Sequence, residues 1–212
     1  MACAHAGRAP TSVQLLAVSK KFSTDDIRQA IAAGQQAFGE NYIQEAIAKI
    51  HALNGMGLQW HCIGAVQSNK SRLVAEHFDW VHTVNSLKLA QRLSVQRPAD
   101  LPPLNVCIQV NIDGSDTKSG VAPDAVPALA QATMALPRLR LRGLMTIPRS
   151  APHFDSQCVA HHSAQQLFAH VQTLLGNADF DTLSMGMSAD LEAAIHCGST
   201  LVRVGSAIFG TR

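Results

Sequence analysis

The sequence feature that most constrains the fold is a regular alternation of short apolar runs with helical patterns along the whole chain. The apolar runs are rich in β-branched residues, and the segment after each run carries apolar residues at helical spacing. This pattern is typical of strands that are buried on both faces of a parallel sheet. We predict eight strands, at residues 15–20, 37–39, 58–63, 79–84, 105–112, 139–147, 182–187 and 201–204.

The segments between these runs predict seven helices. The first helix begins after Ser23, where Ser23 and Asp26 have the spacing of a capping box, and Gly34 is placed to end it in a left-handed conformation. The other six helices are predicted at residues 42–53, 68–76, 86–96, 123–135, 154–175 and 189–196.

Eight strand–helix units within 212 residues predict an α/β protein with a single (β/α)8 TIM-like barrel over residues 1–212. A doubly wound open sheet is the alternative, because periodicity alone does not show closure. In a barrel of this kind the functional end lies at the C-terminal ends of the strands, and the loops after the seventh and eighth strands often hold phosphate.

Composition and charge exclude several classes of protein. The chain is 47% apolar and 15% charged, which argues against disorder, and its 17 basic and 15 acidic side chains are scattered, so no nucleic-acid footprint appears. No apolar run is long enough to span a membrane, and the N-terminus does not resemble a signal peptide. The five cysteines are odd in number and include no C-x-x-C pair, which favours reduced thiols and a cytoplasmic location.

Small, hydroxyl and glycine residues gather at the predicted ends of the last two strands. The seventh strand leads into Ser184–Ser188, and the eighth into Arg203–Ser206. Glycine allows a close backbone approach to an anion, and the N–H groups that open a helix point toward it. These two ends therefore predict a phosphate site.

Lys20 closes the first apolar strand, so its amine is expected at the mouth of the barrel with apolar walls beneath it. An amine in such a position can form an imine with an aldehyde. A lysine, a phosphate pocket and the arginine Arg203 at one end of a barrel together suggest pyridoxal 5′-phosphate (PLP) as the ligand.

Several stretches, in this order along the chain, resemble the pyridoxal phosphate homeostasis protein family, the single-domain relatives of the alanine racemase N-terminal barrel. They are LLAVSK, GENYIQEA, QWHCIGAVQSNK, VNIDGSDTKSGV, RGLMTI, LSMGMSADLEAAI and TLVRVGSAIFGTR, and the resemblance runs from about Ala6 to Arg212. It implies an alanine racemase N-terminal-domain type of barrel that binds PLP. It also implies a role for each matching residue: Lys20 forms the Schiff base, Arg203 faces the pyridine nitrogen, Asn41 lines the ring, and the phosphate is held by Ser184, Gly205 and Ser206.

Two features depart from the family. Its members usually carry a longer N-terminal helix, of which only a stub is present here, so a shortened N-terminal helix is expected. The usual threonine and proline after the VSK motif are replaced by Lys21 and Phe22, which concerns the geometry of the first loop and not Lys20 itself.

A racemase needs a second acid/base group, and the sequence offers no evident one. The chain has one tyrosine, Tyr42, and no residues for a second domain after Arg212. An arginine opposite the pyridine nitrogen also weakens the ring as an electron sink. The expectation is therefore a PLP carrier in vitamin B6 homeostasis that is not an enzyme, a monomer or weak dimer with PLP-dependent apo-enzymes as partners.

Two alternatives stay open at this stage. One is an active PLP-dependent amino-acid racemase or lyase that uses His61 or Tyr42 as a second base, although His61 inside an apolar strand is better read as a hydrogen-bonded core histidine. The other is a barrel enzyme for a phosphorylated metabolite without PLP. Asn41 is as well suited to cap a helix as to contact a ring, Lys118 is better read as a loop lysine than as a phosphate ligand, and the ten histidines form no metal motif.

Overall fold

The structure is a computed structural model that describes residues 1–115 and 119–210. Within these residues the chain forms a closed barrel of eight parallel strands, in which each strand pairs with the next and the first with the last. The predicted (β/α)8 barrel is confirmed, and the open sheet is excluded. The strands are β1 (Gln14–Val18), β2 (Ala37–Glu40), β3 (Gln59–Cys62), β4 (Trp80–Val84), β5 (Leu104–Val110), β6 (Leu139–Thr146), β7 (Thr182–Ser184) and β8 (Leu201–Val204).

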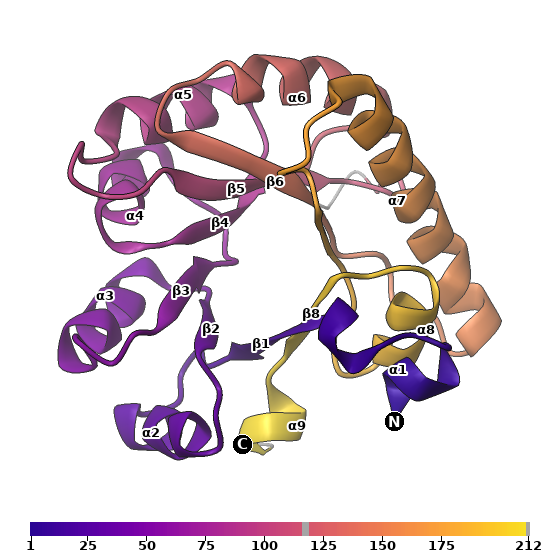
Figure 1. The fold of residues 1–212 in the computed structure, drawn as a ribbon, viewed down its shortest axis with the longest axis horizontal. Helices are drawn as coiled ribbons and strands as arrows, with labels where there is room; N and C mark the ends of the chain where they lie inside the picture. The colour runs from indigo at the N-terminus through magenta and orange to yellow at the C-terminus, as the bar shows by residue number, and fades with distance from the viewer. Residues whose placement is uncertain (116–118, 211–212) are drawn as a thin grey trace.

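Helices surround the strands in the order of the chain (Figure 1). The described α-helices are α1 (Ala2–His5), α2 (Thr24–Ala32), α3 (Ile43–Ala52), α4 (Ser71–His77), α5 (Leu87–Gln96), α6 (Val126–Met134), α7 (Phe154–Leu175), α8 (Leu191–His196) and α9 (Ser206–Phe209). Short 3₁₀ helices at Pro10–Ser12, Ser68–Lys70 and Pro123–Ala125 complete the elements, the last two leading into α4 and α6. Among the described helices, none is both long enough and apolar enough to cross a membrane.

Local sequence signals set several of these boundaries. The predicted capping box at the start of α2 is confirmed, because the Ser23 side chain accepts a hydrogen bond from the backbone of Asp26 and the Asp26 side chain accepts one from the backbone of Ser23. Gly34 has the predicted left-handed conformation, with φ of +95°. The seventh strand is shorter than predicted and ends at Ser184, because Gly186 has φ of +93° and interrupts the extended backbone.

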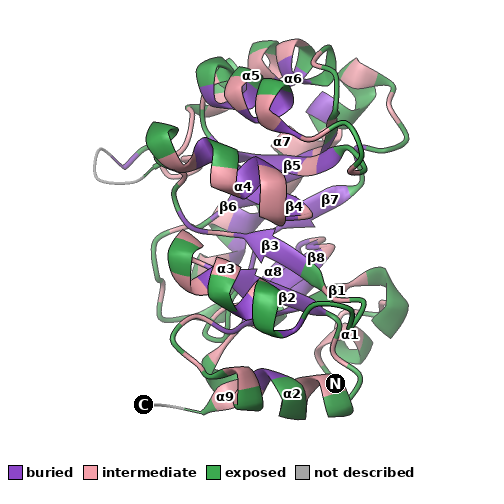
Figure 2. Ribbon diagram, turned by 90° about the vertical axis from the view of Figure 1, so that its left-hand side faces the viewer, coloured by how far each residue is buried: buried purple, intermediate pink, exposed green. Residues whose placement is uncertain are grey.

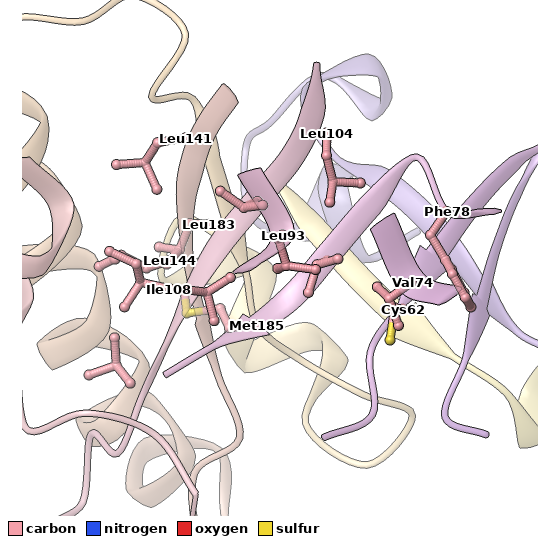
Figure 3. Close-up of a cluster of buried hydrophobic side chains, with 14 of the residues drawn as sticks. Cys62, Val74, Phe78, Leu93, Leu104, Ile108, Leu141, Leu144, Leu183 and Met185 are labelled. Atoms are coloured by element: carbon pink, nitrogen blue, oxygen red, sulfur yellow. The ribbon is translucent and has the colours of Figure 1, made fainter. Parts of the chain in front are cut away.

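Side chains on the strands alternate between the barrel interior and the helical layer. On β3, Cys62 packs in the main apolar cluster between strands and helices, whereas its neighbour His61 is buried in the interior. Figure 2 shows the buried strands enclosed by helices whose outer faces are exposed. In the apolar cluster, Leu93 of α5 lies among strand residues such as Leu104 and Ile108 (Figure 3). Each such side chain contributes roughly 1.5–3 kcal/mol on full burial.

The N-terminal segment packs against the last part of the barrel. Ala2 and Cys3 of α1 contact the cluster of Ile195, Val202 and Val204 beside α8 and β8. Phe22, which precedes α2, stacks on Phe209 of α9 with 4.8 Å between the ring centroids. The helices α1 and α9 both lie near β1 and β8 (Figure 1).

Candidate ligand-binding site

A cavity of about 710 Å³ opens where the strands end at their C-terminal side. This volume lies in the range of small-molecule sites. Residues that follow β1, β2, β7 and β8 line the cavity, together with apolar side chains from the neighbouring strand ends. The lining residues are Val18, Lys20, Phe22, Asn41, Ile63, Ile147, Met187, Ser188, Ala189, Arg203, Gly205, Ser206 and Gly210.

The fold brings five of the six predicted site residues onto this wall: Lys20, Asn41, Arg203, Gly205 and Ser206. They come from opposite ends of the sequence, and the pairing of β1 with β8 makes them neighbours, with Leu16 opposite Arg203 in the register. Among the cavity-lining residues that the structure describes, only Lys20 and Arg203 carry ionisable side chains.

Ser184 is the exception among the predicted residues. It is fully buried, is not part of the cavity wall, and its hydroxyl is engaged by two protein groups, Arg203 Nη1 at 2.7 Å and His82 Nδ1 at 2.9 Å. This placement disagrees with the expected phosphate contact, because Ser184 is the last residue of β7 and its side chain points into the barrel interior. The serine that reaches the cavity from this strand end is Ser188, four residues later.

The Arg203 guanidinium is held by hydrogen bonds to oxygen atoms of β6 and β7. Nη1 donates to the carbonyl oxygen of Ser184 at 2.8 Å and to its hydroxyl at 2.7 Å, and Nη2 donates to the carbonyl oxygen of Thr146 at 2.9 Å. These bonds use three of the five N–H donors of the side chain. Burial lowers the pKa of Arg203 to about 10, so the guanidinium stays positively charged at neutral pH.

Two histidines continue this contact across the barrel. His82 Nε2 lies 2.9 Å from Nδ1 of His61, and the His61 ring stacks on Trp80 with 5.1 Å between centroids and 7° between planes. Burial lowers the pKa of His61 to about 3 and that of His82 well below its ordinary value, so both imidazoles are neutral. His61 is thus a hydrogen-bonded interior histidine, as its apolar strand indicated.

The direction of each hydrogen bond follows from donor and acceptor chemistry. A guanidinium can only donate, so the Ser184 hydroxyl accepts a hydrogen bond from Arg203. The same hydroxyl then donates a hydrogen bond to His82 Nδ1. A neutral His82 then carries its proton on Nε2 and donates to Nδ1 of His61. The hydrogen bonds that link Arg203, Ser184, His82 and His61 therefore all run in the same donor-to-acceptor direction. Sequence reasoning missed them, since the four residues lie on four different strands.

The part of the cavity wall formed after β7 and β8 carries small residues and hydroxyl groups. Ser206 Oγ lies 3.3 Å from Ser188 Oγ, and Ser206 follows Gly205 at the start of the short helix α9. A Cβ on Gly205 would lie 3.2 Å from the carbonyl oxygen of Val18, which is a tight contact. This wall brings two hydroxyl groups close together and suits an anion. Ser188 was present in the predicted strand-end segment, which was the signal available for it.

Asn41, like Lys20, lines the cavity. Its side-chain Oδ1 is buried and has no hydrogen-bond partner among the described residues. The possible helix-capping role is wrong, because the N-cap residue of α3 is Tyr42. Tyr42 does not line the cavity, and its side chain is exposed. Lys118 lies outside the described residues.

Comparison with known proteins gives matches over nearly the whole chain. The family model for the alanine racemase N-terminal domain matches residues 4–212. A pyridoxal phosphate homeostasis protein of Pseudomonas aeruginosa is 56% identical over 98% of this chain and 88% of its own length. Its counterpart in Escherichia coli K12 is 52% identical over 100% of this chain and 91% of its own length. Among solved structures, PipY of Synechococcus elongatus PCC7942 with PLP bound has a TM-score of 0.88 at 37% identity, covering 98% of this chain and 97% of that one.

Proposed function

Because this chain belongs to the pyridoxal phosphate homeostasis protein family, within the larger family of the alanine racemase N-terminal domain, we propose that it binds PLP in the cavity at Lys20. PLP is held there as a Schiff base and is carried without appreciable turnover. The whole chain, residues 1–212, acts as one PLP-binding domain in intracellular vitamin B6 homeostasis.

One observation carries this proposal: the Lys20 amine, a pair of serine hydroxyls and the Arg203 guanidinium line the same cavity. PLP presents an aldehyde, a phosphate and a pyridine nitrogen, and each has a matching group on this wall. Asn41 lines the same cavity and is assigned to the ring of the ligand. The residues present therefore fit PLP.

Each residue then has a defined task. Lys20 supplies the amine that holds the aldehyde carbon, while Gly205, Ser206 and Ser188 hold the phosphate. Arg203 faces the pyridine nitrogen, and its fixed positive charge disfavours protonation there. Ser184 acts one step away from the ligand by positioning Arg203 through the bonds to its carbonyl and hydroxyl oxygens.

The absence of turnover is supported by the groups that the wall lacks. PLP supplies an electron sink when it is bound, and racemisation needs two acid/base groups on opposite faces of the substrate carbon. Within the described part of the wall, Lys20 and Arg203 are the only ionisable side chains, and the pKa of Arg203, at about 10, keeps it protonated. His61 and Tyr42, the two candidate second bases, both lie off the cavity wall.

We propose that the protein works in the cytoplasm as a monomer or weak dimer and passes PLP to PLP-dependent apo-enzymes. All five cysteines are free, which suits a reducing compartment. The relatives from Pseudomonas aeruginosa and Escherichia coli are named pyridoxal phosphate homeostasis proteins.

The test is a visible absorption spectrum of purified protein loaded with PLP, followed by borohydride reduction and peptide mapping. A Schiff-base band and a pyridoxyl group on the Lys20 peptide are expected, and Lys20→Ala should lose both. Lys21→Asn is the matched control, since asparagine tolerates the left-handed conformation of Lys21, with φ of +62°. An adduct on another lysine would overturn the site assignment.

A second assay separates a carrier from an enzyme. The loaded protein is incubated with D- and L-amino acids, and racemised or cleaved products are measured. Turnover that disappears in Lys20→Ala would replace the carrier by a racemase or lyase. A protein that stays colourless with PLP would favour the third class, a barrel that binds another phosphorylated metabolite.

A further inference from the structure

Lys20 is the second residue of a tight turn. The backbone N–H of Phe22 donates to the carbonyl oxygen of Ser19 at 3.1 Å, which closes a four-residue turn over Ser19–Phe22. The third residue, Lys21, has φ of +62°, a left-handed conformation that glycine or asparagine adopts more readily than lysine. Such a conformation persists where the surrounding structure over-determines it, and it is common at functional sites.

A buried lysine on α3 holds the start of this turn. Lys49 Nζ donates to the carbonyl oxygen of Ser19 at 2.7 Å, to Glu40 Oε1 at 2.7 Å and to Glu45 Oε1 at 2.6 Å. These three bonds match the three donors of an ammonium group. The Lys49 side chain is only 7% exposed, and that of Glu40 is not exposed at all. The charge of Lys49 is therefore buried and fully paired.

The two carboxylates hold the turn on both sides of Lys20. Glu40 Oε1 accepts a hydrogen bond from the Ser19 hydroxyl at 2.7 Å, directly before Lys20. Glu45 Oε1 accepts a hydrogen bond from the backbone N–H of Lys21, directly after it. Both peptide units that flank Lys20 are thus tied to one ion cluster, which we call the Lys49 cluster and define as Glu40, Glu45 and Lys49.

We propose that the Lys49 cluster positions Lys20 for Schiff-base formation, by fixing the backbone on both sides of Lys20 so that its amine reaches the aldehyde of the bound ligand. This inference rests on the proposed function. The step joins the Lys20 nitrogen to the aldehyde carbon, a C=N bond replaces the C=O bond, and the oxygen leaves as one water molecule. The cluster touches none of the reacting atoms, so its members are positioning residues.

A purely structural role for the cluster makes a different prediction. It would weaken the binding of every ligand and lower stability in proportion. A positioning role affects only ligands that form the covalent bond. Pyridoxine 5′-phosphate distinguishes the two roles, because it carries an alcohol in place of the aldehyde and cannot form the bond.

The experiment compares Glu45→Ala with wild type, using PLP and pyridoxine 5′-phosphate in parallel. Glu45 is suited to the test because its side chain is 29% exposed, whereas that of Glu40 is not exposed at all. We expect the rate of Schiff-base formation to fall about tenfold, because small misplacements of a reacting group have large effects on rate. The affinity for pyridoxine 5′-phosphate should change by less than about twofold, since binding without the bond needs no aligned amine.

Three further variants complete the design. Glu45→Gln keeps an acceptor oxygen for the Lys21 N–H and should restore most of the rate. Ser19→Ala removes the hydroxyl that donates to Glu40 and replaces Glu45→Ala in the test if that variant does not fold. It should likewise slow Schiff-base formation and leave the affinity for pyridoxine 5′-phosphate nearly unchanged. Glu76→Ala is the control, because it removes a glutamate from another i,i+4 ion pair, the more exposed pair with Arg72 on α4.

The outcomes separate this inference from the proposed function. An equal loss for both ligands, or an unchanged rate in Glu45→Ala and Ser19→Ala, would overturn the positioning role and leave PLP binding intact. Wild-type protein that forms no Schiff base would overturn both.

Discussion

The Nη1 atom of Arg203 lies 2.7 Å from the hydroxyl oxygen of Ser184, so the arginine on the cavity wall is fixed by a residue that does not reach the cavity. The same hydroxyl contacts His82, which extends the contact through the barrel interior to His61. The orientation of one cavity side chain therefore depends on residues of β3, β4 and β7. Ser184 therefore positions Arg203, whereas Ser188, four residues later, lines the cavity itself.

Ser184→Ala should mainly lower stability, and Ser188→Ala should mainly lower PLP affinity. Ser184→Ala leaves a buried histidine nitrogen and an arginine N–H without their partner, so the free energy of unfolding should fall by about 1–3 kcal/mol. Ser188→Ala removes an exposed hydroxyl from the cavity wall, so stability should hold while PLP affinity falls about tenfold, as expected for one lost hydrogen bond to a charged group. Urea denaturation and PLP titration measure the two effects. Equal losses of affinity in both variants would return Ser184 to the phosphate site.

The buried histidines predict a dependence of stability on pH. The unfolded chain takes up protons on these imidazoles near pH 6.5, whereas burial lowers the pKa of His61 to about 3 and that of His82 well below its ordinary value. Because the unfolded state then binds more protons, the free energy of unfolding should fall as the pH falls below 6.5 toward 3.

The measurement for this dependence is urea denaturation between pH 7.5 and pH 4. In His61→Gln the slope should be shallower by up to about 1.4 kcal/mol per pH unit, because one of the two protonations is removed. His162→Gln, an exposed histidine on α7, is the control and should keep the wild-type slope. A wild-type slope in His61→Gln would contradict the neutral buried state of this residue.

Gly64→Ala should distort the cavity wall by displacing the backbone of Asn41. A Cβ at this position would lie 2.2 Å from the backbone oxygen of Asn41, so Asn41 and the cavity wall have to shift. A loss of roughly 1–3 kcal/mol in stability and weaker PLP binding are expected. Gly39→Ala is the control, since its nearest atoms belong to the movable side chains of Leu16 and Ile63, at 3.1 and 3.2 Å. Thermal melts and PLP titration would contradict the prediction if Gly64→Ala behaved no worse than Gly39→Ala.

Thiol reactivity should single out Cys3. Burial raises the pKa of Cys62 and of Cys107 to about 12, and Cys158 and Cys197 are also buried, whereas Cys3 is half-buried. At pH 8 a thiol reagent should modify one cysteine in the native protein and five after denaturation. Cys3→Ser should abolish the native reaction. Rapid modification of a second thiol in the native protein would show that the barrel opens locally.

Much of the architecture follows from local sequence signals. Each apolar run with β-branched residues became a strand, and the boundaries were set by signals such as Ser23 with Asp26 and the left-handed Gly34. The end of β7 was misjudged because Gly186 lies inside an apolar run, and its positive φ is not visible from periodicity. Closure itself needed the pairing of β1 with β8, which joins segments at opposite ends of the sequence.

The chain by itself determined the alternation of strands and helices and the end of the barrel at which chemistry gathers, because secondary-structure periodicity and strand polarity are local properties. Only the tertiary structure decided which side chains meet. It placed the Ser184 hydroxyl within hydrogen-bond distance of Arg203, and it joined the Lys49 cluster to the backbone on both sides of Lys20. Such contacts depend on whether a strand residue points inward or outward and on the register between distant strands, and a shift of one residue reverses the first of these.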